Sequence, residues 1–244
     1  MPGIFISRGV RLVIPPGGLV LSLTRPTPLV TVHVHFDVCP SWCQIALQHL
    51  KDAQRRAAER IEAWAHDDQQ ARGATLEREF EAAMQAIVAA GIAIDAFYAA
   101  VQPHVAIPPA MLKSWREGRT ARHAQIAEVL RRAFRVSPIG FANLKVHLKE
   151  LFRFRDLAVH PSGKLQAPLL HPELDVGVEW RFAFFRAPNA EAVVHSSTGI
   201  IWQLVHSPRP TDARVKEYAV SLRDRLTELF PNGHPSVPVP ESEA

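Results

Sequence analysis

The sequence predicts an α+β protein, mainly α-helical, with a four- or five-helix bundle at its centre and flanking β-strands. Apolar residues recur every three or four positions through most of 42–158, the spacing of helices with one buried face. Residues 1–40 contain short apolar runs between Pro and Gly clusters, which is typical of strands and turns. Large apolar residues alternate over 176–185, as in a half-buried strand.

The composition is that of an ordinary soluble domain, because 47% of the 244 residues are hydrophobic and 21% are charged. Cys39 and Cys43 are too few for a disulfide framework, and their spacing is not that of a C-x-x-C redox pair. No uninterrupted apolar run approaches a membrane span, and the early apolar segment lacks a small-residue cleavage site. We therefore expect a soluble cytoplasmic protein without a membrane segment.

Three regions are expected along the chain: a β lead-in over 1–40, a helical domain with a β insertion over 41–230, and a disordered tail over 231–244. In the lead-in, the runs RLVI, LVLSLT and LVTVHVHFDV read as strands separated by Pro-Pro-Gly-Gly and Pro-Thr-Pro. The tail is Pro-rich and has no hydrophobic period.

Helices are expected over about 42–70, 75–102 and 109–135. The second of these is long, alanine-rich and apolar, so it should be the central core helix. The third is arginine-rich, begins at prolines suited to a first helical turn, and has a weak point at Gly118.

A fourth helix should start at the N-cap Ser137, with Pro138 as its first residue, and end before Pro161. Beyond it the pattern changes to strands over about 174–205, because aromatic and β-branched residues dominate there. A final helix follows over about 210–230.

Charge is concentrated in one part of the chain, since residues 108–164 carry twelve basic residues against four acidic ones. Such a segment can bind a polyanion such as RNA, or can be an ordinary solvated helical surface. The basic residues expected to contact RNA are Lys149, Arg153, Arg131, Arg132 and Arg135.

Arg155 and His160 are the candidate catalytic residues, at the end of the fourth predicted helix with Asp156 between them. Asp156 precedes His160 by one helical turn, so its carboxylate can orient the imidazole. A guanidinium can hold phosphoryl oxygens while an imidazole moves a proton, which suits cleavage of RNA without a metal. The products would carry 2′,3′-cyclic phosphate ends.

The segment RDLAVH resembles the Arg-(x)4-His motif of the HEPN superfamily, α-helical bundles named for higher eukaryote and prokaryote nucleotide binding. Many members of that family are metal-independent ribonucleases whose site forms between two motif helices of a homodimer. Some belong to toxin–antitoxin or antiphage systems. The resemblance implies that Arg155 and His160 are catalytic, with Asp156 at a position that is often Asn in relatives.

The function expected from these features is metal-independent endoribonuclease activity without a cofactor. RNA would be the substrate, the assembly a homodimer, and an antitoxin or regulatory protein a further partner. Two alternatives remain open: a HEPN-like RNA- or nucleotide-binding or regulatory module that does not cleave, and a scaffold that uses only the basic surface.

Two other patterns have functional interpretations beside ordinary structural ones. One predicted strand carries polar residues at every second position, so their side chains should point the same way: His33, His35, Asp37 and Cys39. They could bind a metal ion, or they could simply form a polar strand face. The aromatic residues of 180–184 could stack RNA bases or pack in the core, and the alternation of a half-buried strand favours core packing.

Overall fold

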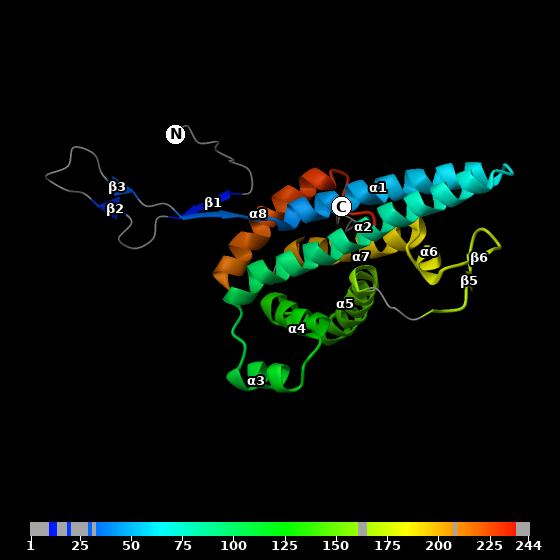
Figure 1. Cartoon of the computed structure of the whole chain (residues 1–244). Helices are drawn as coiled ribbons and strands as arrows, with labels where there is room; N and C mark the ends of the chain where they lie inside the picture. Colours follow the sequence, from blue (N-terminus) through cyan, green and yellow to red (C-terminus); the bar gives the residue numbers. More distant parts are fainter. Residues whose placement is uncertain are drawn as a thin grey trace, which may run out of the picture. The chain divides into compact units, whose positions relative to one another are not determined.

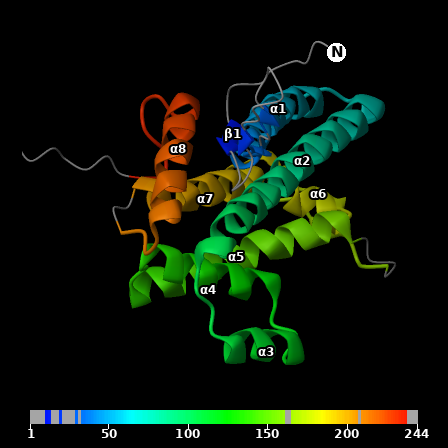
Figure 2. The same cartoon turned by 90° about the vertical axis from the view of Figure 1, so that its left-hand side faces the viewer.

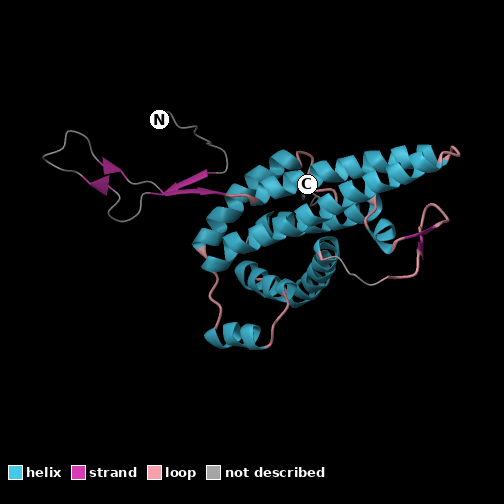
Figure 3. Cartoon of the chain, in the orientation of Figure 1, coloured by secondary structure: helices cyan, strands magenta, loops and turns pink. Residues whose placement is uncertain are grey.

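The protein is described by a computed structural model in which the chain divides into two units, Met1–Val38 and Cys39–Ala244. The described residues are 10–13, 19–20, 29–30, 33–160, 165–206 and 209–237. Helices make up most of the described chain, and the strands are short (Figure 3). The prediction of a mainly helical protein with a small β component is confirmed.

The first unit contains two short antiparallel pairs of strands. β1 (Val10–Val13) pairs with β4 (His33–Phe36), and β2 (Leu19–Val20) pairs with β3 (Leu29–Val30). Each lies in or beside one of the apolar runs expected to form strands. The other residues of those runs lie mostly outside the described part of the chain.

A long helical hairpin forms the frame of the second unit (Figure 1). α1 (Cys39–Trp64) and α2 (Gln69–Val101) are joined by a short turn, in which the Asp68 carboxylate accepts hydrogen bonds from two first-turn N–H groups of α2. Alanine fills much of the buried face of α2, which lets neighbouring helices approach closely.

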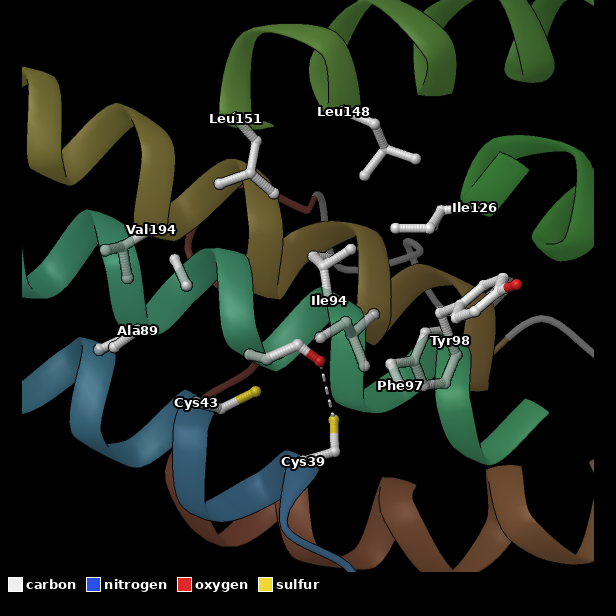
Figure 4. Close-up of a cluster of buried hydrophobic side chains, with 14 of the residues drawn as sticks. Cys39, Cys43, Ala89, Ile94, Phe97, Tyr98, Ile126, Leu148, Leu151 and Val194 are labelled. Carbon is white, nitrogen blue, oxygen red and sulfur yellow. Dashed lines mark hydrogen bonds between the residues drawn. The ribbon is translucent and has the colours of Figure 1, made fainter. Parts of the chain in front are cut away.

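α2 is the central helix, as predicted, because it contacts α1, α4, α5, α7 and α8. Ile94 and Phe97 lie in the core beside residues of α4, α5 and α7 (Figure 4). The segment Gln69–His104 is long and apolar enough to cross a membrane, but half of its most apolar stretch is buried inside the protein. That burial is typical of the core helix of a soluble protein.

The arginine-rich region is two helices rather than one, because the chain breaks at the predicted weak point, Gly118. After the 3-10 turn η1 (Gln102–His104), α3 (Pro109–Glu117) is followed by α4 (Arg122–Phe134). α5 (Pro138–Val159) then begins as predicted, with the Ser137 hydroxyl accepting the N–H of Gly140 at 3.2 Å.

The β insertion expected over 174–205 is wrong. Only β5 (Leu169–Leu170) and β6 (Gly177–Val178) pair there, and the chain then forms α6 (Trp180–Phe184) and α7 (Ala187–His206). The aromatic residues of α6 therefore do not form a strand face. Phe182 and Phe184 instead meet Phe80 of α2 and Phe154 of α5, with ring centroids 5.1 and 6.1 Å apart.

Tertiary packing explains why helix α7 forms from residues that favour strands. Its buried positions recur at helical spacing, from Ala187 through Val194 to Val205, and face α2 and α1. The hydroxyls of Ser197 and Thr198 donate to the carbonyls four residues earlier, at 2.7 Å each, so these polar groups are satisfied inside the helix. Burial of this face outweighs the intrinsic preference for strands.

The last helix, α8 (Ala213–Leu229), lies within the predicted range and starts at the N-cap Asp212. The expected tail is not free over its first part, however. His234 is buried with its Nε2 2.9 Å from Oγ1 of Thr198, and its ring lies close to Gly199 of α7. Residues 238–244 lie outside the described chain.

Candidate active site

Arg155 lies at the interface between α5 and α2. It follows Leu148, Leu151 and Phe152 along the buried side of α5. Gly91 of α2 faces its aliphatic stem so closely that a Cβ at Gly91 would lie 3.0 Å from Cδ of Arg155. The missing side chain of Gly91 therefore makes room for the arginine.

The guanidinium of Arg155 is held by two carboxylates and an aromatic ring. Nη1 donates to Oδ2 of Asp95 at 2.7 Å, while Nε and Nη2 donate to Oδ1 of Asp156 at 3.2 and 3.0 Å. Its central carbon lies 4.4 Å from the ring centroid of Phe152. The side chain is 23% exposed, so it is fixed in place but still reaches solvent.

Asp95 connects this arginine to α4. Its Oδ1 accepts a hydrogen bond from Nε of Arg122 at 3.0 Å, and the Arg122 guanidinium lies 4.1 Å from the ring centroid of Tyr98. Two arginines and two carboxylates thus alternate across α4, α2 and α5 as Arg122, Asp95, Arg155 and Asp156. Their formal charges cancel.

A second histidine, His123, lies beside this row on α4 and is half-buried. Burial lowers the pKa of His123, the cations of Lys149 and Lys145 lower it further, and the Asp156 carboxylate opposes them. His123 is therefore neutral near pH 7 and can accept a proton.

His160 is the exposed C-cap of α5, with extended backbone angles (φ −117°, ψ 90°) and its N–H bonded to the carbonyl of Asp156 at 2.9 Å. This conformation agrees with a residue that precedes proline. The expected contact between the Asp156 carboxylate and the His160 imidazole does not occur among the described hydrogen bonds. That carboxylate binds Arg155 instead, because the guanidinium is a permanent cation and its neighbour in sequence.

The basic residues expected to bind RNA are already paired with acids in several cases. Arg131 and Arg132 share Glu128, with contacts of 2.6 to 2.8 Å. Hydrogen bonding from Arg131 lowers the pKa of Glu128, and Arg132 adds to this effect. Arg135 ends α4 in a left-handed conformation (φ 51°) and is exposed.

The remaining two cations lie on the solvent side of α5. Arg153 pairs with Glu150 at 2.8 Å, and Lys149 is exposed and close enough to lower the pKa of His123. The structure therefore places Lys149 near the arginine–carboxylate row, whereas Arg131 and Arg132 form a separate group around Glu128.

The alternative metal site is not supported at Cys39. This residue begins α1 rather than continuing the strand, is buried, and contacts the carbonyl of Ala93 through Sγ at 3.6 Å (Figure 4). The side chains of His33 and His35 lie outside the described part of the chain.

Sequence reasoning missed Asp95, Arg122 and His123. Asp95 had a usable signal, because it is the only charged residue between 82 and 101 of an otherwise apolar helix. A lone carboxylate on a core helix needs a cationic partner from another element. The sequence does not say which of its arginines that partner is.

Comparisons with known proteins identify no relative: no family model, no curated protein and no solved structure matches the chain.

Proposed function

We propose that the protein is a metal-independent endoribonuclease of the HEPN type, with Arg155 and His160 as its catalytic residues. The observation that carries the proposal is the state of Arg155. Asp95, Asp156 and Phe152 hold its guanidinium and Gly91 makes room for its stem, yet part of the side chain remains open to solvent. A preorganised cation of this kind stabilises charge that develops on a phosphoryl group.

In the proposed reaction the 2′-hydroxyl of RNA loses its proton to an imidazole and attacks the adjacent phosphorus. The bond to the 5′-oxygen breaks, that oxygen takes up a proton, and the 2′,3′-cyclic phosphate and 5′-hydroxyl ends result. His160 supplies one proton transfer. His123, which burial keeps neutral, is a second imidazole on the adjoining helix that suits the role of base.

Substrate binding would use Lys149 and Arg153 beside the site, and Arg131, Arg132 and Arg135 at the end of α4. Contacts with phosphates from these side chains would position RNA without reading its sequence. The protein would act in the cytoplasm, and an antitoxin or regulatory protein could cover the same surface.

We further propose a two-fold homodimer that brings two Arg155 side chains to one shared cleft, since an isologous interface does this with a single patch. Sedimentation at tens of micromolar protein should show a dimer. A monomer at that concentration, or a dimer with the two His160 residues on opposite surfaces, contradicts this assembly.

One observation favours a second candidate, a HEPN-like module that binds RNA or a nucleotide, or regulates a partner, without cleaving. Asp95 and Asp156 already neutralise Arg155 and Arg122, so a phosphate has to compete with two carboxylates for the guanidinium. A structural ion-pair row between helices has the same features.

Cleavage of a mixed RNA pool in EDTA distinguishes the two candidates. The wild-type protein should create new cyclic-phosphate ends, and Arg155→Lys and His160→Ala should abolish them while the melting temperature stays close to wild type. Lysine keeps the charge but loses the planar fork. His66→Ala, which removes an exposed histidine in the turn between α1 and α2, should cut normally. RNA retained intact by the wild type would favour the binding module.

A further inference from the structure

A hollow of about 540 Å³ lies between α3 and the start of α4. Its lining residues are Leu112, Trp115, Arg116, Arg119, Thr120 and Gln125. We call it the α3–α4 pocket. Its volume is in the range of sites that take small ligands. Two connecting segments hold α3 apart from the other helices (Figures 1 and 2), so the pocket is bordered by a short arm rather than by the bundle core.

The backbone turn that ends α3 shapes this pocket. The N–H of Gly118 donates to Ser114 at 2.8 Å and that of Thr120 to Trp115 at 3.0 Å, which reverses the chain. Arg119, between them, takes a left-handed conformation (φ 46°) that non-glycine residues rarely adopt. Three of the lining residues, Trp115, Arg116 and Arg119, therefore lie within a stretch of five residues at this turn.

The charge on this rim is not neutralised within the described chain. Neither Arg116 nor Arg119 has a carboxylate partner among the described residues, and the only acid of α3, Glu117, lies 3.7 Å from Lys113. Arg116 is oriented by a bond from its Nε to the carbonyl of Leu112 at 3.3 Å. By contrast, Arg122, Arg131 and Arg132 on α4 all contact acids.

The remaining walls supply a flat ring and an amide. Trp115 is half-buried and packs against the edge of the core, so its indole is held in place while part of it faces solvent. Gln125 donates its amide N–H to the carbonyl of Thr120 at 2.7 Å, which fixes the side chain and leaves its amide oxygen as an acceptor. An aromatic face beside two guanidiniums suits a ligand with a flat base and a phosphate.

We propose that the α3–α4 pocket binds one nucleotide of a single-stranded RNA, with the base stacked on Trp115 and its phosphate held by Arg116 and Arg119. This inference rests on the proposed function for the choice of RNA as ligand, but it does not require cleavage. An acidic peptide would contact Arg116 and Arg119 but would not need the indole of Trp115, so RNA accounts for more of the pocket than a peptide does.

The test measures binding of a short single-stranded RNA with 2′-O-methyl riboses, which cannot be cut through the 2′-oxygen. Fluorescence anisotropy should show at least about fivefold weaker binding for Trp115→Ala, because stacking on one base is worth that much or more. Arg116→Gln with Arg119→Gln should weaken binding similarly and reduce its salt dependence. Trp115→Phe, which keeps an aromatic face, should bind almost as wild type.

Lys113→Gln is the matched control, since it removes a cation from the same helix that is paired and lies outside the pocket lining. Adenosine monophosphate should compete with the RNA at lower concentrations than adenosine or inorganic phosphate, which each supply half of the contacts. Loss of affinity in the arginine variant but not in Trp115→Ala would overturn base stacking. Equal competition by a polyglutamate peptide, or no change in any pocket variant, would overturn the site.

These outcomes are separable from failure of the nuclease proposal. If wild-type protein leaves natural RNA intact while Trp115→Ala still weakens binding of the methylated RNA, the pocket stands and cleavage fails. If RNA is cut through Arg155 while the pocket variants bind and cut as wild type, the pocket proposal fails alone.

Discussion

Gly91 shows how one residue of α2 positions the candidate catalytic arginine. The stem of Arg155 occupies the space that a side chain at Gly91 would need, and Asp95 lies one helical turn further along α2 and binds the guanidinium. An apolar helix thus carries both the gap and the counter-charge that Arg155 requires. Gly91 and Asp95 together explain why a charged residue, Arg155, can lie beside the buried apolar residues of α5.

Gly91→Ala should disturb Arg155, and Gly73→Ala provides the control within the same helix. Nothing lies within 4 Å of a Cβ at position 73, so alanine there should raise the free energy of unfolding by about 0.5–1 kcal/mol through helix propensity. At position 91 the gain in helix propensity is offset, because the stem of Arg155 has to move to make room for the alanine Cβ. Thermal unfolding and RNA cleavage rates measure the two effects.

We expect Gly91→Ala to give a smaller rise in melting temperature than Gly73→Ala and a lower cleavage rate. Equal stabilisation by both variants, with wild-type cleavage by Gly91→Ala, would show that Gly91 does not position Arg155.

At the scale of elements, α4 carries its cations in two different states. Arg122 belongs to the arginine–carboxylate row, whereas Arg131 and Arg132 share the single carboxylate of Glu128. The second group has a net positive charge. Because Glu128 competes with any phosphate for these two arginines, it should limit their contribution to RNA binding.

Removing that carboxylate by Glu128→Gln should increase RNA affinity and steepen its salt dependence. The triple variant Arg131→Gln, Arg132→Gln, Arg135→Gln should do the opposite, lowering the log–log salt slope by up to about one unit for each lost phosphate contact. Filter binding at several salt concentrations provides the measurement. If these arginines only form a solvent-exposed helix surface and do not contact RNA, neither variant will change RNA binding. The electrostatic part of the proposal then fails even where cleavage is observed.

The segment after α8 is held on α7 by a neutral histidine. Thr198 donates its hydroxyl hydrogen to Val194, so it accepts the Nε2 hydrogen of His234, while Nδ1 of His234 accepts the N–H of Ser236 at 3.2 Å. Burial lowers the pKa of His234 to about 4, and His195 adds to the shift. Protonation would break the bond from Ser236.

Stability should therefore depend on pH between about 4 and 6.5. In this window the unfolded chain binds a proton at His234 that the folded chain does not, so the free energy of unfolding rises with pH. Urea unfolding should show a loss of up to about 3 kcal/mol from pH 6.5 to pH 4 from this residue. His123 and His171, whose pKa values are also lowered by burial, contribute in the same direction.

His234→Gln should flatten this pH dependence, whereas His66→Gln, at an exposed position, should leave it unchanged. An unaltered pH profile in His234→Gln would mean that His234 does not titrate as the buried geometry requires.

Over the whole second unit, a buried ionic network joins segments that are distant in sequence. Arg60 of α1 contacts Glu79 of α2 and Glu173 beyond β5, and Arg186 also contacts Glu173. The second oxygen of Glu79 accepts the N–H of Ala187 at 2.9 Å. Arg60 and Glu79 are almost fully buried, so each depends on the other for its charge.

Glu79→Gln should lower the free energy of unfolding by up to about 3–5 kcal/mol, because it removes the fully buried carboxylate partner of Arg60 and leaves only the partly exposed Glu173 to balance that charge. Glu77→Gln, on the exposed side of the same helix, should change it by less than about 0.5 kcal/mol. Chemical denaturation followed by circular dichroism would test the pair of variants. A small effect of Glu79→Gln would mean that Glu173, rather than Glu79, balances the charge of Arg60.

Much of the helical framework was predictable, because its signals are local. The apolar periods of α1, α2, α5 and α8, the cap at Ser137 and the break at Gly118 all depend on residues close together in sequence. The strand prediction over 174–205 failed because it relied on the aromatic and β-branched residues there and not on the helical spacing of the apolar residues that α7 buries. Tertiary contacts of α7, chiefly with α2 and α1, decide between the two structures.

The sequence by itself determined the position of Arg155 and His160 at a helix end that precedes a proline, and the concentration of positive charge around them. Tertiary structure decided how those charges are used. It joins Arg155 to Asp95, gives the Asp156 carboxylate to Arg155 rather than to His160, and places His123 near Lys149. Among the residues that the structure describes, it also provides no acidic partner for Arg116 or Arg119. Side-chain pairing between helices depends on which faces pack together, and the spacing within one helix does not carry that information.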